Sequence, residues 1–290
     1  MDTRTRTTPE LEALVEQLRL ERLDQDLFLG DPGKGDGRLF GGLVAAQSVA
    51  ATYATVEDRS IHSFHAYFIR PGRHDVPIRF LVYRIRDGRS FTTRDVVAYQ
   101  AGEAIFQASM SFTVPEEGVD EHQEPKPPAP PPEECEAWMW PGLERAKEEE
   151  RKRWFRKRPI AVLNADPGYK LLGEETPRRQ VWIRMRGELP DEEVFHAAAI
   201  AYASDTGLLS TARGVMGPGR RNSASLDHSI WYHHPPRYDD WLLYASQSPI
   251  AHSARALIYG ELYRRDGVRV ASVVQEGLIR PARENGSSSR

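Results

Sequence analysis

The chain contains two copies of one sequence pattern, and this duplication constrains the fold more than any other feature. The first copy has a block at 62–72 that reads HSFHAYFIRPG, and the second has a block starting at 227 that reads DHSIWYHHPP. Each block is followed by an alternating stretch with a turn inside it, at 91–112 and at 254–279. Equivalent positions are about 163–165 residues apart, which is too long for a solenoid unit and suits a duplicated domain. If the copies pack together, the pocket between them is the first place to expect chemistry.

Composition excludes several classes of function. Of the 290 residues 40% are hydrophobic, which is enough for two cores, and the net charge of −3 gives no electrostatic case for a nucleic-acid partner. The single cysteine, Cys135, cannot form an internal disulfide, which fits a reducing compartment. No apolar run approaches the length of a membrane span, and no phosphate-loop or dinucleotide fingerprint is present. We therefore expect a cytoplasmic protein with no membrane span, no metal and no cofactor.

The order of patterns predicts four segments. These are an N-terminal domain at 1–115, a proline-rich linker followed by a charge-dense helix at 116–158, a C-terminal domain at 159–284 and a disordered tail at 285–290. Both domains are expected to have the same content, which is a long helix of small residues and an antiparallel meander. This combination predicts the α+β class, with each sheet wrapped around a central helix.

Local signals place the elements of the first copy. Thr8 and Pro9 are typical of a helix start, as a hydroxyl cap followed by proline at the first helical position. Glycine and aspartate in 30–37 predict a loop, and the small residues of 39–56 predict the buried helix. Alternating stretches bounded by turns predict strands at 63–69, 76–86, 90–100 and 103–114.

The second copy repeats this order. After a predicted strand at 180–186, Asp191 is expected to cap a helix of small residues that runs through Ala203. The sheet is then supplied by predicted strands at 223–233, 240–248, 254–263 and 269–279.

An aspartate in the second small-residue helix is the strongest candidate for chemistry. Asp205 follows an alanine-rich stretch that we expect to be buried, and a buried carboxylate is costly unless other groups hold it. Ser225 and Gln275, on predicted strands of the same copy, could supply a hydroxyl and an amide. The helix of the first copy has no acid before Glu57, which predicts one competent site per chain. The alternative is that Asp205 only ends the helix, because Thr-Gly follows it.

Several strings resemble the acyl-CoA thioesterase II family, and the motifs occur in that family's order from about Leu11 to about Arg280. The strings that carry the resemblance are Arg38-Leu39-Phe40-Gly41-Gly42, His62-Ser63-Phe64-His65-Ala66-Tyr67-Phe68-Ile69-Arg70-Pro71-Gly72, Arg86-Asp87-Gly88-Arg89-Ser90-Phe91, Tyr202-Ala203-Ser204-Asp205, Leu226-Asp227-His228-Ser229-Ile230-Trp231 and Val274-Gln275-Glu276-Gly277.

The resemblance implies a double hotdog fold and hydrolysis of fatty acyl-CoA to free fatty acid and CoA. The family's catalytic aspartate, threonine and glutamine fall on Asp205, Ser225 and Gln275, so a serine replaces the usual threonine. The hydroxyl is kept, but the methyl group that restricts its rotamers is lost. We expect Asp205 to act as general base on a water that Ser225 and Gln275 orient.

Substrate contacts are expected around this trio. A backbone N–H near a helix N-terminus would stabilise the oxyanion, and the candidates are Gly41 and Gly42, which allow close approach of substrate. The CoA phosphates could meet arginines in the glycine-rich loop before Ser225, namely Arg213, Arg220 and Arg221. Hotdog sheets leave edges that usually pair between subunits, so a homo-oligomer is expected.

Other functions remain open at this stage. A serine hydrolase would need a Gly-x-Ser-x-Gly elbow, which is missing, and His228 is expected on the strand face opposite Ser225. A hotdog enoyl-CoA hydratase could use Asp191 and His196, although Glu-Val stands where that family has Asn-Pro. The replacement of threonine by serine leaves a non-catalytic acyl-CoA-binding hotdog protein as a further alternative.

Overall fold

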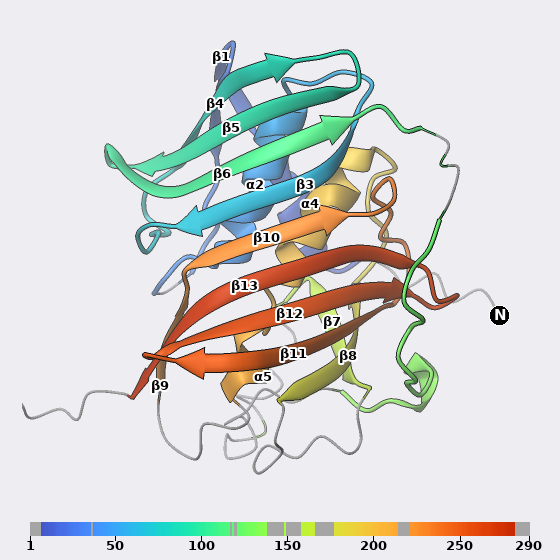
Figure 1. The fold of residues 1–290 in the computed structure, drawn as a ribbon. Helices are drawn as coiled ribbons and strands as arrows, with labels where there is room; N and C mark the ends of the chain where they lie inside the picture. The colour runs from blue at the N-terminus through green and yellow to red at the C-terminus, as the bar shows by residue number, and fades with distance from the viewer. Residues whose placement is uncertain are drawn as a thin grey trace, which may run out of the picture.

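The computed structural model of the chain describes residues 7–35, 37–116, 118, 121–137, 148, 158–165, 177–213 and 221–281. The predicted tail at 285–290 and almost all of the predicted charge-dense helix lie outside these residues. In the described part, thirteen strands form one antiparallel sheet, and two long helices lie together on the same side of it (Figure 1).

The sheet consists of two halves with the same arrangement, each built around one buried helix. The first half contains β1 (Glu21–Asp24), β2 (Leu27–Gly30), β4 (Ile78–Asp87), β5 (Phe91–Gln100), β6 (Glu103–Thr113) and β3 (Ser60–Phe68), in that spatial order, around α2 (Gly41–Tyr53). The second half contains β10 (Asp227–Tyr232), β13 (Arg269–Pro281), β12 (Arg255–Arg264), β11 (Leu242–His252), β8 (Arg178–Met185) and β7 (Ile160–Asn164), around α4 (Glu193–Ser204). The short strand β9 (Arg221–Ser225) also pairs with β13. The predicted α+β class, with each half curled around a helix, is confirmed.

The two repeated blocks lie side by side in space, where they join the halves. Strand β3 pairs antiparallel with β10, and His65 lies directly opposite Ser229. The His65 ring Nδ1 is 3.1 Å from the Ser229 hydroxyl, across a separation of 164 residues in the sequence. That separation is the repeat spacing itself, so the pseudo-twofold axis of the duplication passes between these two residues.

The two central helices run antiparallel to each other at close range. Tyr53, at the end of α2, donates a hydrogen bond of 2.7 Å to Glu193, at the start of α4. At the other end, a Cβ added to Gly42 would be 2.8 Å from the backbone oxygen of Tyr202. Both helices are buried nearly all round, and alanines are the most frequent of their buried residues. The small residues noted in the sequence are therefore what allows the helices to touch.

Three predictions of local structure were wrong. Helix α1 (Pro9–Leu18) begins at the predicted proline, but the hydroxyl of Thr8 makes no capping bond. Asp191 does not cap α4, because its carboxylate accepts a hydrogen bond from Arg237 instead. The strand predicted at 223–233 is interrupted at Leu226, which separates β9 from β10.

The proline-rich segment packs along the second half, and this contact was not expected of a spacer. The indole N–H of Trp182 donates to the Pro130 carbonyl at 2.8 Å. The side chain of Gln123 bonds to the backbone of Gly267 and Arg269, at 2.8 and 3.0 Å.

The predicted domain boundaries stay a prediction. In the described residues, no helix combines the length and the apolar character needed to cross a membrane.

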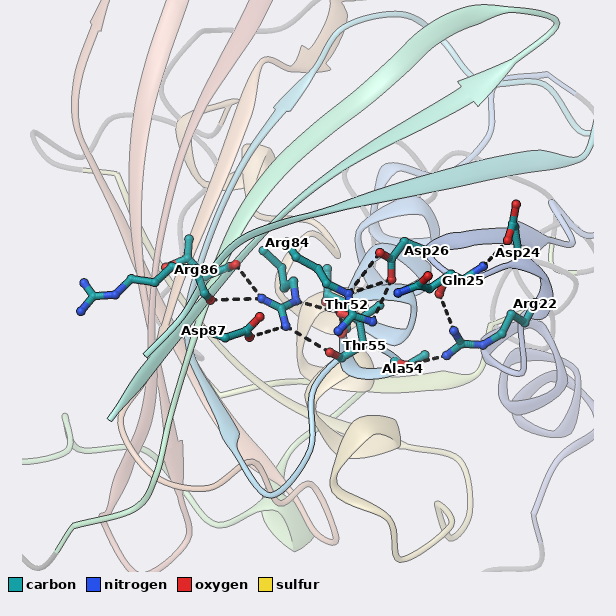
Figure 2. A network of polar contacts seen from close by, with 12 residues as sticks. Arg22, Asp24, Gln25, Asp26, Thr52, Ala54, Thr55, Arg84, Arg86 and Asp87 are labelled. Atoms are coloured by element: carbon teal, nitrogen blue, oxygen red, sulfur yellow. Dashed lines mark hydrogen bonds and ion pairs between the residues drawn. The ribbon is translucent and has the colours of Figure 1, made fainter. Parts of the chain in front are cut away.

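Arginine side chains cap the carboxyl end of α2, where the helix carbonyls have no partner within the helix. The buried guanidinium of Arg94 donates to the hydroxyl and the carbonyl of Thr55, at 3.0 and 3.2 Å, and to the Asp87 carboxylate at 2.6 Å. Arg22 donates to the Ala54 carbonyl at 2.6 Å, and Arg84 pairs with Asp26 nearby (Figure 2). The carbonyls at the end of the helix therefore accept from charged donors, of which Arg94 is buried and Arg22 is exposed.

Replacing Arg94 by leucine should lower the free energy of unfolding by about 2–4 kcal/mol, because the buried hydroxyl and carbonyl of Thr55 lose their donors. Urea denaturation measures this loss. The matched control is Arg84→Leu. The side chains of Arg84 and Asp26 are 38% and 25% exposed, so the loss of their ion pair should lower the free energy of unfolding by less than about 1 kcal/mol. Equal losses in the two variants would contradict the role of Arg94 as a helix cap.

Candidate active site

Asp205 is the C-cap residue of α4, so the helix does end there, as the alternative interpretation proposed. Ending the helix is not its only feature, however. The Asp205 carboxylate accepts hydrogen bonds from the Gln275 amide nitrogen at 2.8 Å and from the Ser225 hydroxyl at 3.2 Å, both on Oδ1. The backbone N–H of Gly42 also donates to this carboxylate. The structure thus brings the three predicted side chains together around one acid.

The surroundings of Asp205 change its protonation. Burial raises the pKa of the carboxyl from 3.8 to about 6, while the hydrogen bonds from Gln275, Ser225 and Gly42 lower it. Burial is the larger effect, because it removes the charge from water. The carboxylate is therefore mainly ionised at neutral pH, yet it holds a proton far better than an exposed aspartate does. These are the properties of a general base.

Two strands of the second half hold the partners of Asp205. Gln275 lies on β13 with its side chain fully buried, and Ser225 ends β9, where it is opposite Gly277 of β13. Leu226 then bends the chain between β9 and β10, with its N–H bonded to Glu276 and its carbonyl bonded to Phe68. The bend fixes Ser225 beside the carboxylate.

A cavity of about 320 Å³ opens beside Asp205, between the two halves. The second half contributes Asp205, Ser225 and neighbouring backbone, and the first half contributes mainly apolar side chains. The apolar lining residues of the first half are Leu39, Val44, Phe68, Ile69, Ile105 and Phe106. This is the location that the duplication predicted for a binding pocket.

The start of α2 forms one wall of the site, and its glycines are required there. A Cβ on Gly41 would be 2.6 Å from the Phe68 ring and 3.1 Å from Oδ2 of Asp205, the oxygen that neither Gln275 nor Ser225 contacts. Gly41 lines the cavity, and the neighbouring Gly42 uses its N–H on Asp205. The N-terminus of a helix also carries a partial positive charge, which favours negative charge in this corner.

The arginines at the cavity differ from those that we expected. Arg220 lies outside the described residues, and the structure does not describe the side chains of Arg213 and Arg221. The cationic residues of the lining are Arg38 and Arg70, both from the first half. Both arginines occur in the strings that resemble the family, so the sequence did single out these segments. It did not show that they lie beside Asp205, because they are far from it along the chain.

Sequence reasoning also misplaced His228. We expected this residue on the strand face opposite Ser225, but its buried ring lies 3.1 Å from the Gln275 amide nitrogen and 2.8 Å from the Ser204 hydroxyl. The parity argument failed because the bend at Leu226 breaks the alternation of side chains. Burial lowers the pKa of His228 to about 3, so the ring is neutral. Its two ring contacts go to Ser204 and Gln275, so it does not activate Ser225 as a nucleophile.

The residues of the hydratase alternative do not form a site. Asp191 is exposed and pairs with Arg237, whereas His196 is buried and accepts the Tyr238 N–H at 3.0 Å. Neither residue lines the cavity. Within the part of the chain that the structure describes, no group of three or more histidine, cysteine or acidic side chains could hold a metal ion.

At the other end of the helix pair, where α2 ends and α4 begins, a different acid occupies the place that corresponds to that of Asp205. There Glu193 accepts hydrogen bonds from Tyr53 and Ser60, at 2.7 and 2.8 Å, and the Tyr53 oxygen accepts the N–H of Ile61. The pKa of Tyr53 is raised, first by burial and then by the Glu193 charge, so the phenol stays protonated. Helix α2 of the first copy has no acid of its own at this end. The carboxylate there belongs to Glu193 of α4, and both of its oxygens accept hydrogen bonds from hydroxyl groups.

Comparison with known proteins agrees with the geometry. A family model described as acyl-CoA thioesterase matches residues 149–278, and one described as acyl-CoA thioesterase N-terminal domain matches 31–113. The chain is 37% identical to acyl-coenzyme A thioesterase 8 of Homo sapiens, covering 91% of this chain and 87% of that protein. It is 34% identical to acyl-CoA thioesterase 2 of Haemophilus influenzae, covering 93% and 98%.

Solved structures give the same result. An acyl-CoA thioesterase II from Mycobacterium marinum superposes with a TM-score of 0.75 at 37% identity, covering 96% of this chain and 100% of that chain. A hot dog fold protein from Alicyclobacillus acidocaldarius, at 18% identity, has the same TM-score of 0.75, covers 93% and 99%, and supports the fold alone. The chain therefore belongs to the acyl-CoA thioesterase II family, with the double hotdog fold.

Proposed function

We propose that this chain hydrolyses fatty acyl-CoA thioesters to free fatty acid and CoA in the cavity beside Asp205. The observation that carries the proposal is a single one. A carboxylate with a pKa raised to about 6 lies against an apolar cavity and is held by the hydroxyl and amide that such a reaction needs. A thioester carbonyl is a good electrophile, so the enzyme has mainly to hold and deprotonate a water.

The reaction uses Asp205 as general base. Gln275 and Ser225 both donate to Oδ1 of this carboxylate, which leaves Oδ2 on the side of Gly41 to take the proton of the water. The amide oxygen of Gln275 is buried behind the cavity lining and has no hydrogen-bond partner among the described residues, so it is the acceptor that we assign to the second proton of the same water. The water oxygen forms a bond to the carbonyl carbon, the C–S bond breaks, and the proton held by Asp205 goes to the departing thiolate.

The negative charge that develops on the carbonyl oxygen is stabilised at the start of α2. Gly42 already donates its N–H to Asp205, so Gly41 is the remaining donor of the predicted pair. A helix N-terminus places such a donor in a favourable field, and the missing Cβ keeps the oxyanion position open.

Substrate recognition divides between the two halves. The acyl chain lies against the apolar residues of the first half, and the charged end of CoA meets Arg38 and Arg70. Arginine suits phosphate, because its planar guanidinium offers several donors at once. No cofactor takes part, because CoA is the leaving group.

The alternative of a non-catalytic binding protein would need the same cavity but not an acid in it. Keeping Asp205 in a cavity where burial disfavours its charge costs stability, and acyl-CoA binding does not require that cost. A location in the cytoplasm, a role in fatty acid metabolism, association into a homo-oligomer and the absence of a nucleic-acid partner stay predictions.

Exchange of Asp205 for asparagine should reduce kcat at least about a hundredfold, because the nearly isosteric amide cannot take a proton. A thiol-release assay over acyl-CoAs of several chain lengths measures it. The control is Asp227→Asn, because the Asp227 carboxylate lies outside the cavity and accepts the N–H of Glu276 at 2.6 Å. Near-normal turnover in Asp205→Asn would refute the assignment, and tight binding of acyl-CoA by the parent without thiol release would favour the binding protein.

The pH dependence follows from the pKa of Asp205. The base must be unprotonated, so kcat/KM should fall about tenfold per pH unit below pH 6 and should level off above it. The substrate should be an acyl-pantetheine thioester, because the phosphate monoester of CoA titrates near the same pH. His228 does not interfere, since its pKa is about 3. A flat profile between pH 5 and pH 7 would exclude Asp205 as the base.

Removing either cavity arginine should weaken binding and leave the chemistry unchanged. Arg38→Ala and Arg70→Ala should each raise KM for acyl-CoA about tenfold, because a charged hydrogen bond to phosphate is lost. The same variants should keep the parent's KM for an acyl-pantetheine thioester, which has no phosphate groups. Arg79→Ala removes an exposed arginine that does not line the cavity and serves as the control. An equal rise in KM for both substrates would show that these arginines do not recognise phosphate.

A further inference from the structure

A closed ring of hydrogen bonds leads from α4 through two strands and back to the catalytic carboxylate. It starts on α4, where the Ser204 hydroxyl donates to the Ala201 carbonyl at 3.1 Å. Ser204 also contacts His228 of β10 at 2.8 Å, and His228 contacts Gln275 of β13 at 3.1 Å. Gln275 then donates to Asp205, which follows Ser204 directly in the chain.

The direction of every bond in this ring follows from the ionised carboxylate of Asp205, which can only accept. Gln275 therefore turns its amide nitrogen toward Asp205, and the same nitrogen faces Nδ1 of His228, which must accept the second amide proton. A neutral imidazole has one N–H, so the His228 proton is on Nε2 and is donated to the Ser204 hydroxyl, whose own proton goes to the Ala201 carbonyl.

This order fixes which way the Gln275 amide faces. With the nitrogen between two acceptors, the amide oxygen remains as the buried atom without a partner among the described residues. If the amide turned over, its oxygen would face both the Asp205 carboxylate and the lone pair of His228 Nδ1. Both contacts would be repulsive, so His228 and Asp205 together hold one orientation.

We infer that His228 is a positioning residue, which, through its Ser204-bound Nε2–H, holds the Gln275 amide oxygen toward the attacking water. The inference rests on the proposed function, because the water is the nucleophile of that reaction. Neither His228 nor Gln275 is among the residues that line the cavity, so His228 acts on the site only through the amide and the carboxylate in front of it.

Packing alone does not account for this residue. His228 is fully buried, its ring packs edge-on to Phe64, and burial disfavours its charged form. A buried polar ring is costly unless both nitrogens are satisfied, and an aliphatic side chain would fill the same space at lower cost. The chain holds both nitrogens in bonds of fixed direction, and one of those bonds ends on a residue of the proposed catalytic set.

Two exchanges of His228 separate positioning from packing. Asparagine places its amide oxygen near the position of Nδ1 and keeps an acceptor for Gln275. Glutamine places its amide nitrogen near the position of Nε2 and keeps the donor to Ser204, but it has no acceptor beside Gln275. We expect His228→Asn to keep kcat within about tenfold of the parent and His228→Gln to lose about a hundredfold, with KM unchanged in both, because misplacing a reacting group costs roughly that much.

A purely structural role predicts the opposite order, because glutamine is closer to histidine in size. Equal kcat values in the two variants, or the better activity in His228→Gln, would overturn the inference. These outcomes leave the proposed function intact, since that is tested separately by the activity of the parent and its loss in Asp205→Asn. If neither variant folds, Ser204→Ala still applies: loss of one neutral hydrogen bond should lower kcat about fivefold at constant KM, and unchanged kcat would contradict the ring.

A spectroscopic measurement on the parent tests the ring independently of activity. Nitrogen-15 NMR of histidine-labelled protein, with His228 assigned by comparison with His228→Asn, should show a neutral ring protonated on Nε2 down to pH 5. A ring protonated on Nδ1 would place a donor against the Gln275 nitrogen and would overturn the inference.

Discussion

The active cavity depends on the antiparallel contact between α2 and α4. Each central helix would be buried in its own half in any case, but only this contact places the carboxyl end of one helix against the amino end of the other. The approach is possible because glycine and alanine line it, and Gly42 leaves no room for a Cβ beside the Tyr202 backbone. At that point a carboxylate, Asp205, meets the backbone N–H of Gly42. A larger residue on either helix would separate the acid from the positive end that stabilises it.

The same contact accounts for the single site that we propose in a duplicated fold. Two antiparallel helices meet at two ends, and each end of this pair has a carboxylate with a serine hydroxyl. At one end both side-chain donors of Asp205 use Oδ1, so Oδ2, near Gly41 and beside the cavity, accepts from neither of them. At the other end both oxygens of Glu193 are occupied, one by Tyr53 and one by Ser60. Asymmetry in hydrogen bonding therefore distinguishes the proposed general base from the acid at the other end, and of the two helices only α2 begins with a glycine.

Much of this arrangement could be predicted from the sequence, because it depends on local patterns. The repeat spacing, the small-residue helices and the alternating strands predicted a double hotdog, and the costly acid in an alanine-rich helix pointed to Asp205. What was missed depends on contacts between distant residues. His228 was misplaced because one bend at Leu226 reverses strand parity, and Arg38 and Arg70 reach the cavity only once β3 and β10 pair. Asp191 and Thr8 have the residue types of helix caps, but the first pairs with Arg237 and the second makes no capping bond.

Ser225, where the resemblance to the family implies a threonine, gives the hydrogen-bond ring more weight in the proposed site. A serine hydroxyl turns more freely than a threonine hydroxyl, and its bond to Asp205 is the longer of the two side-chain bonds, at 3.2 Å against 2.8 Å for Gln275. The fixed element of the trio is therefore the amide, which is held by Asp205 at the end of α4 and by His228 on β10. A site with one loosely held hydroxyl can keep its geometry if its remaining donor is held this firmly. If Ser225, Gln275 and Asp205 act together as we propose, the geometry of the site therefore depends more on the amide of Gln275 and on His228 behind it than on the hydroxyl of Ser225.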